Sequence, residues 1–505
     1  MRGSVYNFAN KKVLVMGLGR FGGGVDVVTF AHAAGAKVVV TDLAQAEQLS
    51  ASVSRLGNLE GIEFHLGSHD PADFGQADIV VANPAVPDDN EFLQIARRAG
   101  KLVTSQMNIF FELCPATIIG ITGANGKSTT TALTAHLLRN TKDEGRWTRD
   151  EPQATSDEPV IASEAKQSQP TQYAIRNTHY ENVWLSGNIG NQPLLTTVDQ
   201  MSPDDLVVLE LSSFQLEQLA QIQRAPKVAL LTNLTPNHLD RHGTFANYCA
   251  AKENIFKFQT LDEDSPAISI FNAEDEVASA WFEKYKNDPG RICIKFCAGD
   301  VSEELRSVFS LPGRANLSNL AAAMAIARHF GVDENQIRNS LPEFKALPHR
   351  LEFVERIDGV SWYNDSKATT PQGAITALEA FEQPIIIIAG GYDKNLPFDE
   401  LGEKIFQRAK SAILIGQTAP KIADAIQLAE LRVTSHKPRV TISQIVGSLA
   451  EAVLLAHALA VAGDVVLLSP ACASYDMFDN YEHRGREFIN LVRAFSTKKA
   501  GVQTT

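Results

Sequence analysis

Short apolar runs alternate with segments of helical periodicity along almost the whole chain. Examples are KKVLVMG (residues 11–17), ATIIGITG (116–123) and PIIIIAGG (384–391), and many of these runs end directly in Gly, Asn, Asp, Ser or Thr. This pattern is typical of parallel sheets that are covered by helices. It predicts an α/β fold, with ligands expected outside the carboxyl ends of the strands.

The length of the chain and two breaks in this rhythm suggest three domains. A chain of 505 residues is too long for one core, because domains usually hold roughly 100 to 200 residues. One break is EFKALPHRLEF (343–353), where Pro348 interrupts the chain. With a boundary there and another near residue 106, we predict a Rossmann-like N-terminal domain (1–106), a central P-loop-type domain with a mostly parallel sheet (107–346) and a Rossmann-like α/β C-terminal domain (347–505). The polar segment 141–182 lacks apolar periodicity, which predicts a mobile surface insertion.

Charge and cysteine content exclude several classes of partner. The formal net charge of −13 argues against binding to nucleic acid. The five cysteines lack C-x-x-C spacing, so neither a disulfide framework nor a zinc site is indicated. No apolar run approaches the roughly 18 residues needed to cross a bilayer, and the first residues form no signal peptide. We therefore expect a cytoplasmic protein without membrane insertion.

The segment VLVMGLGRFGGG (residues 13–24) is the first candidate binding motif. Gly17, Gly19 and Gly22 fit G-x-G-x-x-G after an apolar strand, and Asp42 ends the next strand. Such a loop presents a helix N-terminus to a pyrophosphate, and the carboxylate would bind a ribose. One hypothesis is therefore a nicotinamide-dependent oxidoreductase, although this motif is common.

The segment GITGANGKSTT (residues 120–130) predicts a phosphate-binding loop. It follows an apolar strand and opens a helical segment, and Gly120, Gly126, Lys127 and Ser128 are interpreted as a G-x-x-x-x-G-K-[ST] motif. Backbone N–H groups would surround phosphates, the lysine would add charge, and the hydroxyl of Ser128 could ligate Mg²⁺. A second hypothesis is therefore a P-loop ATPase or kinase that acts as a regulatory module.

Three polar residues downstream are further candidates for the site. Glu210 lies inside the strand DLVVLELSS, a costly place for a carboxylate without a metal. His238 follows another strand and is weak evidence alone. Lys252 falls within the apolar stripe of the helical segment 245–259. Either its stem carries the charge out to water, or the amine is neutral and can react with CO₂ to form a metal-binding carbamate.

These motifs, together with SGNIG, ELSSFQLE, NHLDRH, AAKENIF, LPGRANLSNLAAA and LPHRLE, resemble the Mur ligases, ATP-dependent amide-forming enzymes of peptidoglycan synthesis. YNDSKATTP (363–371) and LLSPACASYDMFDNYEHRG (467–485) are similar to the branch that adds D-glutamate to UDP-N-acetylmuramoyl-L-alanine. The resemblance implies an acyl-phosphate intermediate, ATP and two Mg²⁺ ions as requirements, and two small-molecule substrates. We also expect a monomer.

The resemblance also implies roles for individual residues. The catalytic residues would be Lys127, Glu210, His238 and Lys252. One Mg²⁺ would be held by Ser128 and Glu210, and a second by His238 and carbamylated Lys252. ATP would contact Gly123, Ala124, Asn125, Gly126, Lys127, Ser128, Thr129, Asn316, Arg350, Asp365 and Lys367. The UDP-sugar would contact Arg20, Phe21, Asp42, Leu43 and Asn188. D-Glutamate would contact Thr369, Lys394, Ser474 and Tyr481.

The chain departs from the family pattern at several binding positions. Ala315 stands where a histidine is usual before Asn316, Thr370 where an asparagine is usual, and Tyr481 where a phenylalanine is usual. Asn83 lies in NPAVP, where S-P-G is more common. None of these changes removes a charge or a metal ligand, so we expect the chemistry to be retained.

Overall fold

The computed structural model describes residues 6–20, 22–140, 180–187, 189, 193–432 and 443–500. The chain packs as two compact units, the first made of Met1–Phe296 with Ala322–Ser340 and the second of Cys297–Ala321 with Leu341–Thr505. The domain boundaries expected near residues 106 and 346 stay predictions. Phe21, Asn188 and residues 141–179 of the expected insertion lie outside the described residues.

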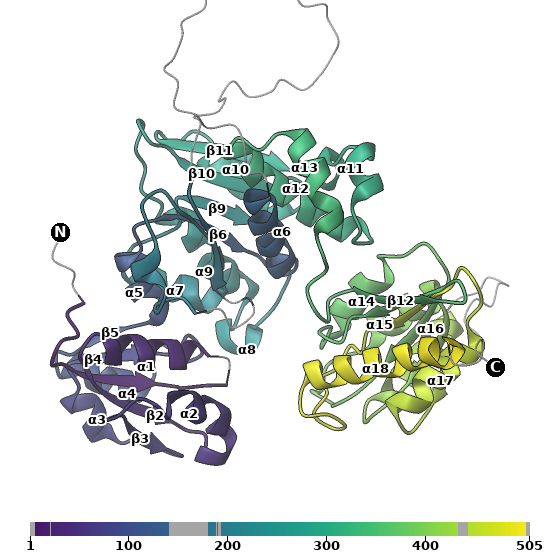
Figure 1. Ribbon diagram of the computed structural model, residues 1–505, viewed down its shortest axis with the longest axis horizontal. Coiled ribbons are helices and arrows are strands. Elements are labelled where there is room, and N and C mark those ends of the chain that lie inside the picture. The colour runs from purple at the N-terminus through teal and green to yellow at the C-terminus, as the bar shows by residue number, and fades with distance from the viewer. Residues whose placement is uncertain are drawn as a thin grey trace, which may run out of the picture. The chain divides into compact units, whose positions relative to one another are not determined.

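Unit 1 begins with a parallel sheet, drawn in purple in Figure 1. Its spatial order is β3 (Glu63–Leu66), β2 (Lys37–Asp42), β1 (Lys12–Met16), β4 (Ile79–Ala82) and β5 (Leu102–Thr104). The helices of this region are α1 (Gly23–Ala33), α2 (Ser50–Leu56), α3 (Pro71–Gln76), α4 (Glu91–Arg98) and α5 (Gln106–Leu113).

The central strand β1 shows why this sheet needs a continuous apolar run. Val13 and Val15 pack in one buried cluster with residues of α1. Leu14 and Met16 point to the other face, into a cluster that contains residues of α3 and α4. Because successive side chains on a strand alternate between faces, a strand covered on both faces must be apolar throughout.

A second parallel sheet in unit 1 follows the first along the chain. Its spatial order is β11 (Arg291–Phe296), β10 (Ala267–Asn272), β9 (Val228–Leu231), β6 (Thr117–Thr122), β8 (Leu206–Glu210) and β7 (Val183–Gly187). The helices of unit 1 along this stretch are α6 (Lys127–Arg139), α7 (Ser213–Gln221), α8 (Leu239–His242), α9 (Phe245–Lys257), α10 (Glu276–Tyr285) and α13 (Glu334–Ser340). Helix α11 (Glu303–Val308) belongs to unit 2, and α12 (Arg314–His329) is divided between the two units after Ala321.

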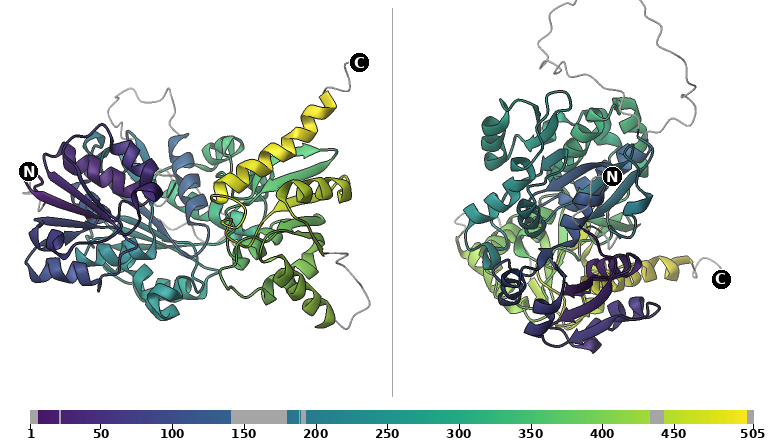
Figure 2. Two further views of the ribbon diagram at one scale, coloured as in Figure 1. Left: turned by 90° about the horizontal axis from the view of Figure 1, so that it is seen from below. Right: turned by 90° about the vertical axis from the view of Figure 1, so that its left-hand side faces the viewer.

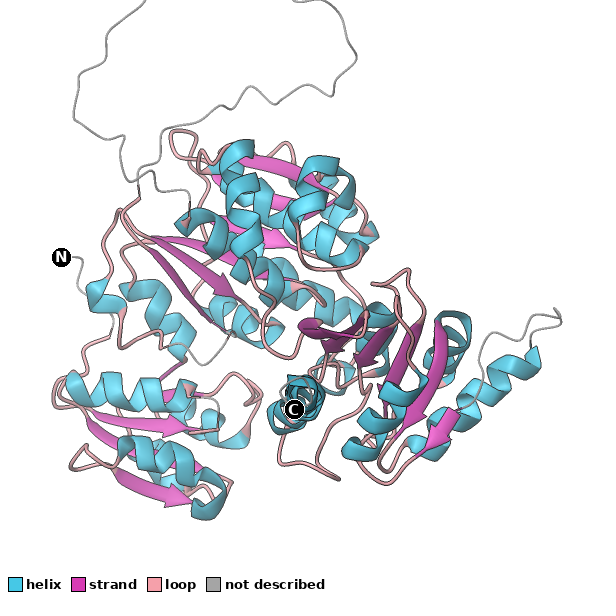
Figure 3. Cartoon of the chain, turned by 45° about the vertical axis from the view of Figure 1, so that its right-hand side comes forward, coloured by secondary structure: helices cyan, strands magenta, loops and turns pink. Residues whose placement is uncertain are grey.

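Unit 2 contains a mixed sheet with helices on both faces (Figure 3). Its order is β12 (Glu352–Ile357), β13 (Val360–Asn364), β17 (Val465–Leu468), β14 (Ile385–Ala389), β15 (Ala409–Leu414) and β16 (Ser443–Ile445). Only β12 and β13 pair antiparallel among these described strands. The helices are α14 (Pro371–Leu378), α15 (Asp399–Arg408), α16 (Ala419–Arg432), α17 (Leu449–Leu459) and α18 (Tyr481–Ala500).

Strand β14 divides its side chains between two cores. Ile385 and Ile387 pack in the cluster that holds residues of α14, α15 and α16. Ile386 and Ile388 pack in the cluster that holds residues of α17 and α18. Helix α18, drawn in yellow in Figure 2, lies beside β12 and β13. The expected α/β fold is thus confirmed, with parallel sheets in the first two regions and a mixed sheet in the third. Within the described ranges, no helix has both the length and the apolar character to cross a membrane.

A close backbone approach at Gly24 generates a prediction about stability. A Cβ on this residue of α1 would lie 2.2 Å from the carbonyl oxygen of Leu18. Gly24→Ala should therefore force α1 away from the loop and lower the free energy of unfolding by about 2 kcal/mol. Gly75→Ala in α3 is the matched control, because a Cβ there meets no atom within 4 Å. Thermal unfolding gives the Tm of each variant, and equal Tm values for Gly24→Ala and Gly75→Ala would contradict the packing argument.

Candidate active site

The carboxyl ends of the parallel strands β6, β8 and β9 meet at one edge of the second sheet. Ile121 of β6 pairs with Glu210 of β8 on one side, and Thr122 pairs with Leu231 of β9 on the other. Three chain segments therefore leave the sheet side by side: the glycine-rich loop, the segment after Glu210 and the segment that leads to His238. This is the edge at which an open parallel sheet binds ligands.

The glycine-rich loop turns tightly into helix α6. Gly126 is the N-cap of α6 with φ 81°, in the left-handed region that favours glycine. At Gly123 (φ 149°) a Cβ would come 1.9 Å from the Thr232 hydroxyl oxygen, so only glycine fits. Helix α6 begins at Lys127, and its first N–H groups face the loop, as an anion site requires.

The end of strand β9 holds this loop in place. Ala124 N donates to the backbone oxygen of Asn233 (2.8 Å), and Asn125 N donates to its side-chain oxygen (2.9 Å). Thr232 Oγ1 in turn donates to the Asn125 carbonyl (2.6 Å). Sequence reasoning missed Thr232 and Asn233, although the polar ending of KVALLTN was a usable signal.

The interpretation of Gly120 as the first glycine of the phosphate motif is wrong. The spacing G-x-x-x-x-G-K-[ST] would put that glycine at Ile121. Gly120 instead lies inside strand β6, where a Cβ would come 2.3 Å from Pro226 Cγ. Its small size serves packing within the sheet, and the loop proper begins at Gly123.

Lys252 is buried beside this edge. The residue is 2% exposed, which rules out the account in which its stem carries the ammonium to water. Nζ donates to Thr122 Oγ1 (3.1 Å) and lies 4.9 Å from the ring centre of Tyr248. Burial, reinforced by the positive charge of Lys127, lowers the pKa of Lys252 well below its usual range, and the Glu210 carboxylate only partly opposes this.

His238 lies within electrostatic range of both lysines. It is the N-cap of the short helix α8, with φ 51° and ψ 37°, and its ring meets Phe214 edge-on at 5.2 Å between centres. His238 is exposed overall, yet neighbouring protein atoms partly desolvate its ring and lower the pKa of His238; Lys127 and Lys252 add to this effect while Asp240 opposes it. The imidazole is therefore held in the neutral form that can bind a metal.

The donor groups at this edge are suited to Mg²⁺. Ser128 and Glu210 supply a hydroxyl and a carboxylate and are 4% and 2% exposed. Among the described residues, no three His, Cys, Asp or Glu side chains come close enough to form a metal site on their own. A hard cation that keeps substrate oxygens and water among its ligands fits such a sparse oxygen set.

The first glycine-rich loop of unit 1 is also built around close contacts. At Gly17 (φ 89°) a Cβ would come 2.8 Å from Asn83 Cβ. Asp42 accepts hydrogen bonds from Gly19 N (3.1 Å) and Ala44 N (2.9 Å). Arg20 and Leu43, which were expected beside the UDP-sugar, are exposed. The carboxylate of Asp42 thus stabilises the loop backbone.

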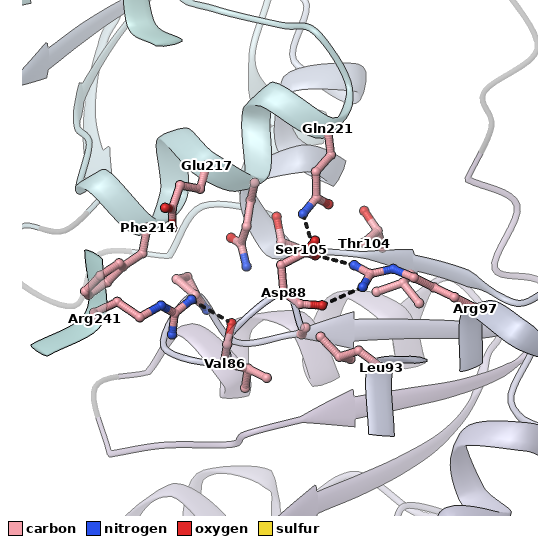
Figure 4. Close-up of a pocket in the computed structure, with 14 residues that line it drawn as sticks. Val86, Asp88, Leu93, Arg97, Thr104, Ser105, Phe214, Glu217, Gln221 and Arg241 are labelled. Carbon is pink, nitrogen blue, oxygen red and sulfur yellow. Dashed lines mark hydrogen bonds and ion pairs between the residues drawn. The ribbon is translucent and has the colours of Figure 1, made fainter. Parts of the chain in front are cut away.

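A hollow in unit 1 is lined by residues of the first sheet region, such as Ala82 and Thr104, and by residues of α7 and α8, such as Phe214 and Arg241. Figure 4 shows Arg241 pointing toward Val86, whose carbonyl oxygen accepts from the guanidinium (3.2 Å). The guanidinium also donates to the carbonyl oxygen of Ala85 (2.8 Å). Gln221 Nε2 donates to Asp88 Oδ1 (2.9 Å). These contacts fasten the two regions of unit 1 to each other.

One of the expected nucleotide residues of unit 2, Asp365, is a buried carboxylate. Asp365 follows β13 and accepts from Ser469 Oγ (2.7 Å) and Leu351 N (3.2 Å). Burial raises the pKa of Asp365 to about 7, and its hydrogen bonds and the charges of Arg350 and Arg484 oppose this rise. Arg350 and Lys367 are partly buried nearby in the chain.

Arg484, which sequence reasoning missed, joins two loops of unit 2. Its guanidinium is 1% exposed and donates to Ser366 Oγ (3.0 Å), to the Ser366 carbonyl (2.8 Å) and to the Cys472 carbonyl (3.1 Å). Burial lowers the pKa of Arg484 to about 10, so the group stays charged at neutral pH. It holds the loop with Asp365 against the loop with Ser474.

The remaining expected contacts of unit 2 differ in exposure. Lys367 Nζ lies 5.3 Å from the ring centre of Tyr481, and Ser474 is 2% exposed. Lys394 is exposed and Thr369 is half-buried. Asn316 donates to the Pro312 carbonyl (2.8 Å) and accepts from Asn319 (3.1 Å). The roles of these residues stay predictions.

Comparison with known proteins gives a consistent result along the chain. Residues 11–105 match the Mur ligase MurD-like N-terminal domain, 121–327 the Mur ligase middle domain, and 349–472 the Mur ligase glutamate ligase domain. A protein of Roseiflexus sp., UDP-N-acetylmuramoylalanine--D-glutamate ligase, is 39% identical over 97% of this chain and 99% of its own length. The chain belongs to the Mur ligase family. Like-named proteins of Pelotomaculum thermopropionicum and Clostridium botulinum are 35% and 33% identical to this Mur ligase over 96% of its length and at least 97% of theirs.

Membership of this family confirms the resemblance and decides among the three hypotheses. This Mur ligase is an ATP-dependent, ADP-forming ligase. The G-x-G-x-x-G motif therefore does not indicate an oxidoreductase, and the phosphate loop does not belong to a regulatory ATPase without ligase activity.

The raised pKa of Asp365 makes stability depend on pH. In the unfolded chain the carboxyl ionises near pH 4, whereas in the folded chain it holds its proton up to about 7. The contribution of Asp365 to the free energy of unfolding is therefore fully present below about pH 4. It is lost as the pH rises to about 7, by about 1.4 kcal/mol per pH unit. Asp365→Asn should gain Tm relative to the wild type between pH 5 and pH 8. Parallel Tm profiles for the two proteins would contradict the buried-carboxyl account.

Proposed function

We propose that this chain joins D-glutamate to UDP-N-acetylmuramoyl-L-alanine in the synthesis of a peptidoglycan precursor. The observation that carries the proposal is the similarity, over nearly the whole chain, to proteins named UDP-N-acetylmuramoylalanine--D-glutamate ligase. The motifs at 363–371 and 467–485 support D-glutamate as the added amino acid. A cytoplasmic monomer stays part of this proposal.

The phosphate loop would bind the triphosphate of ATP. The loop residues Gly123–Thr129 would surround the phosphates, because the N-terminus of α6 presents N–H groups and a positive dipole end there. Lys127 Nζ now donates to the Ala124 carbonyl (2.9 Å) and would turn to the transferred phosphoryl group. Asn316 would contact adenine, and Arg350, Asp365 and Lys367 would contact the nucleotide.

Two Mg²⁺ ions would complete this site. Ser128 and Glu210 would hold one, and His238 and carbamylated Lys252 the other. Bound Mg²⁺ offsets charge on the phosphoryl oxygens and lets two anions approach each other.

The surroundings of Lys252 support a carbamate on its amine. The nitrogen of a neutral amine can attack the carbon of CO₂ and release one proton to solvent, which leaves an anionic carbamate with two oxygen donors. The positive charge of Lys127, which disfavours a second ammonium nearby, would stabilise that anion. The carbamate nitrogen keeps one N–H, which would go on donating to the Thr122 hydroxyl oxygen, now at 3.1 Å from Nζ, while that hydroxyl donates to the Leu211 carbonyl.

The reaction would proceed through an acyl phosphate. An oxygen of the substrate L-alanine carboxylate attacks the γ-phosphorus of ATP, and the bond to ADP breaks. The D-glutamate amine then attacks the acyl carbon, loses a proton, and phosphate leaves with the oxygen that had attacked. Lys127 and the N-terminus of α6 would stabilise the charge on the phosphoryl group during transfer.

The other two substrates would lie at the regions expected from the sequence. Arg20, Asp42 and Leu43 would approach the UDP portion of the nucleotide-sugar at the first glycine-rich loop; Phe21 and Asn188 complete this expected set. D-Glutamate would contact Thr369, Lys394, Ser474 and Tyr481. The diphosphate at the N-terminus of α1 replaces the NAD pyrophosphate that the motif alone suggested.

The substrate specificity can be tested with a panel of amino acids. Purified enzyme, ATP, Mg²⁺ and UDP-N-acetylmuramoyl-L-alanine should release ADP with D-glutamate and at most slowly with L-glutamate, L-lysine or diaminopimelate. The assay measures ADP release together with the mass of the product. Turnover with a diamino acid and none with D-glutamate would refute the proposed function.

The carbamate role of Lys252 predicts chemical rescue. Lys252→Ala should lower kcat by on the order of a thousandfold, because a metal ligand beside the phosphoryl group is lost. Short carboxylates such as acetate or propionate should restore part of this activity by filling the space with an anion. Lys257→Ala, at the end of the same helix, is the control. A Lys252→Ala enzyme with full activity would exclude this role.

A further inference from the structure

One buried carboxylate outside the phosphate site links the two sheets of unit 1. Asp26 lies in the first turn of α1, four residues after the glycine that caps this helix, and is 6% exposed. Buried carboxylates are rare unless hydrogen bonds compensate for the lost hydration. The partners of Asp26 lie mainly on a segment more than 160 residues away in the sequence.

Five donors converge on this carboxylate. Oδ2 accepts from Leu194 N (3.0 Å), Leu195 N (2.8 Å) and Gln106 Nε2 (2.6 Å). Oδ1 accepts from Thr196 N (3.1 Å) and Thr196 Oγ1 (2.7 Å). The two carboxylate oxygens thus accept five hydrogen bonds, which compensate for the hydration lost on burial.

The hydrogen bonds of Asp26 connect the first glycine-rich loop with the second sheet. The edge of that sheet where β6, β8 and β9 end beside the phosphate loop is called the phosphate edge below. Asp26 belongs to the helix whose N-terminus faces the first glycine-rich loop. The segment that it holds follows strand β7, whose last residue, Gly187, pairs with Glu210 at the phosphate edge. At Gly187 a Cβ would come 2.5 Å from the Glu210 carbonyl oxygen, so the ends of β7 and β8 also pack closely against each other. A shift of α1 would therefore move the UDP-binding loop relative to the phosphate edge.

We propose that Asp26 is a positioning residue that sets the distance between the UDP-binding loop and the phosphate edge. It would thereby place the L-alanine carboxylate of the nucleotide-sugar at the γ-phosphate. This inference rests on the proposed function, because it needs a substrate that spans both regions. Asp26 touches no substrate atom in this account and acts through α1 and residues 194–196.

Asp26→Asn tests this role, because it keeps the size of the side chain and places an NH₂ group against N–H donors. UDP alone occupies only the first region, whereas UDP-N-acetylmuramoyl-L-alanine spans both. The Kd for UDP should stay unchanged, while kcat/KM for the full substrate falls by on the order of ten- to a hundredfold, as expected for a small misplacement. The KM for ATP should not change.

Two further variants make the test specific. Asp73→Asn alters another buried carboxylate of the same region, which pairs with His65 (2.5 Å), and should leave all of these constants unchanged. Thr196→Val removes one donor to Asp26 and should act in the same direction with a smaller effect, which provides the test if Asp26→Asn does not fold.

Two outcomes would contradict the positioning role of Asp26, and a third would contradict the proposed function alone. An equal loss of affinity for UDP and for the full substrate would show that Asp26 only shapes the loop, and unchanged constants for both would exclude any role. A wild-type enzyme that binds both ligands but does not turn over D-glutamate would refute the proposed function. In that case the role of Asp26 would still be decided by comparing the Kd values of the wild type and of Asp26→Asn for UDP and for UDP-N-acetylmuramoyl-L-alanine.

Discussion

The candidate active site depends on three strand ends held at one edge of a parallel sheet. Thr232 and Asn233, just after β9, hold the backbone of the phosphate loop through hydrogen bonds of 2.6 to 2.9 Å. The hydroxyl of Thr122, at the end of β6, donates to the Leu211 carbonyl (2.7 Å) and accepts from Lys252. The loop and the lysine are therefore held to neighbouring strand ends by hydrogen bonds, and the backbone of Glu210 is held by the pairing of β8 with β6.

Much of the fold could be predicted from the sequence because parallel sheets leave a simple pattern. Strands such as Ile385–Ala389 are covered on both faces, so they are apolar at every position and end where polar loops begin. The mixed character of the third sheet was harder to predict. It arises from the single antiparallel pairing of β12 with β13. The two residues between them, Asp358 and Gly359, both have positive φ and form a hairpin turn, so the Asp-Gly pair was a usable signal that sequence reasoning missed.

The site could be predicted where chemistry demands an unusual residue in its surroundings. Lys252 in an apolar stripe and Glu210 inside an apolar strand violate the pattern of their elements, and both are buried at the same edge. Asp26, Thr232, Asn233 and Arg484 could not be found in this way. Each acts through partners far away in the sequence, and a polar residue at a helix start or strand end is ordinary. Gly120 shows the opposite error, in which a packing glycine was given a binding role.

The central claim is that ATP activates the carboxylate of the nucleotide-sugar as an acyl phosphate. The most direct measurement uses UDP-N-acetylmuramoyl-L-alanine labelled with ¹⁸O in its terminal carboxylate, with ATP, Mg²⁺ and D-glutamate. Mass spectrometry of the released phosphate should find one ¹⁸O atom per turnover, because the C–O bond breaks when the amine displaces phosphate. Unlabelled phosphate formed together with the amide product would contradict this account.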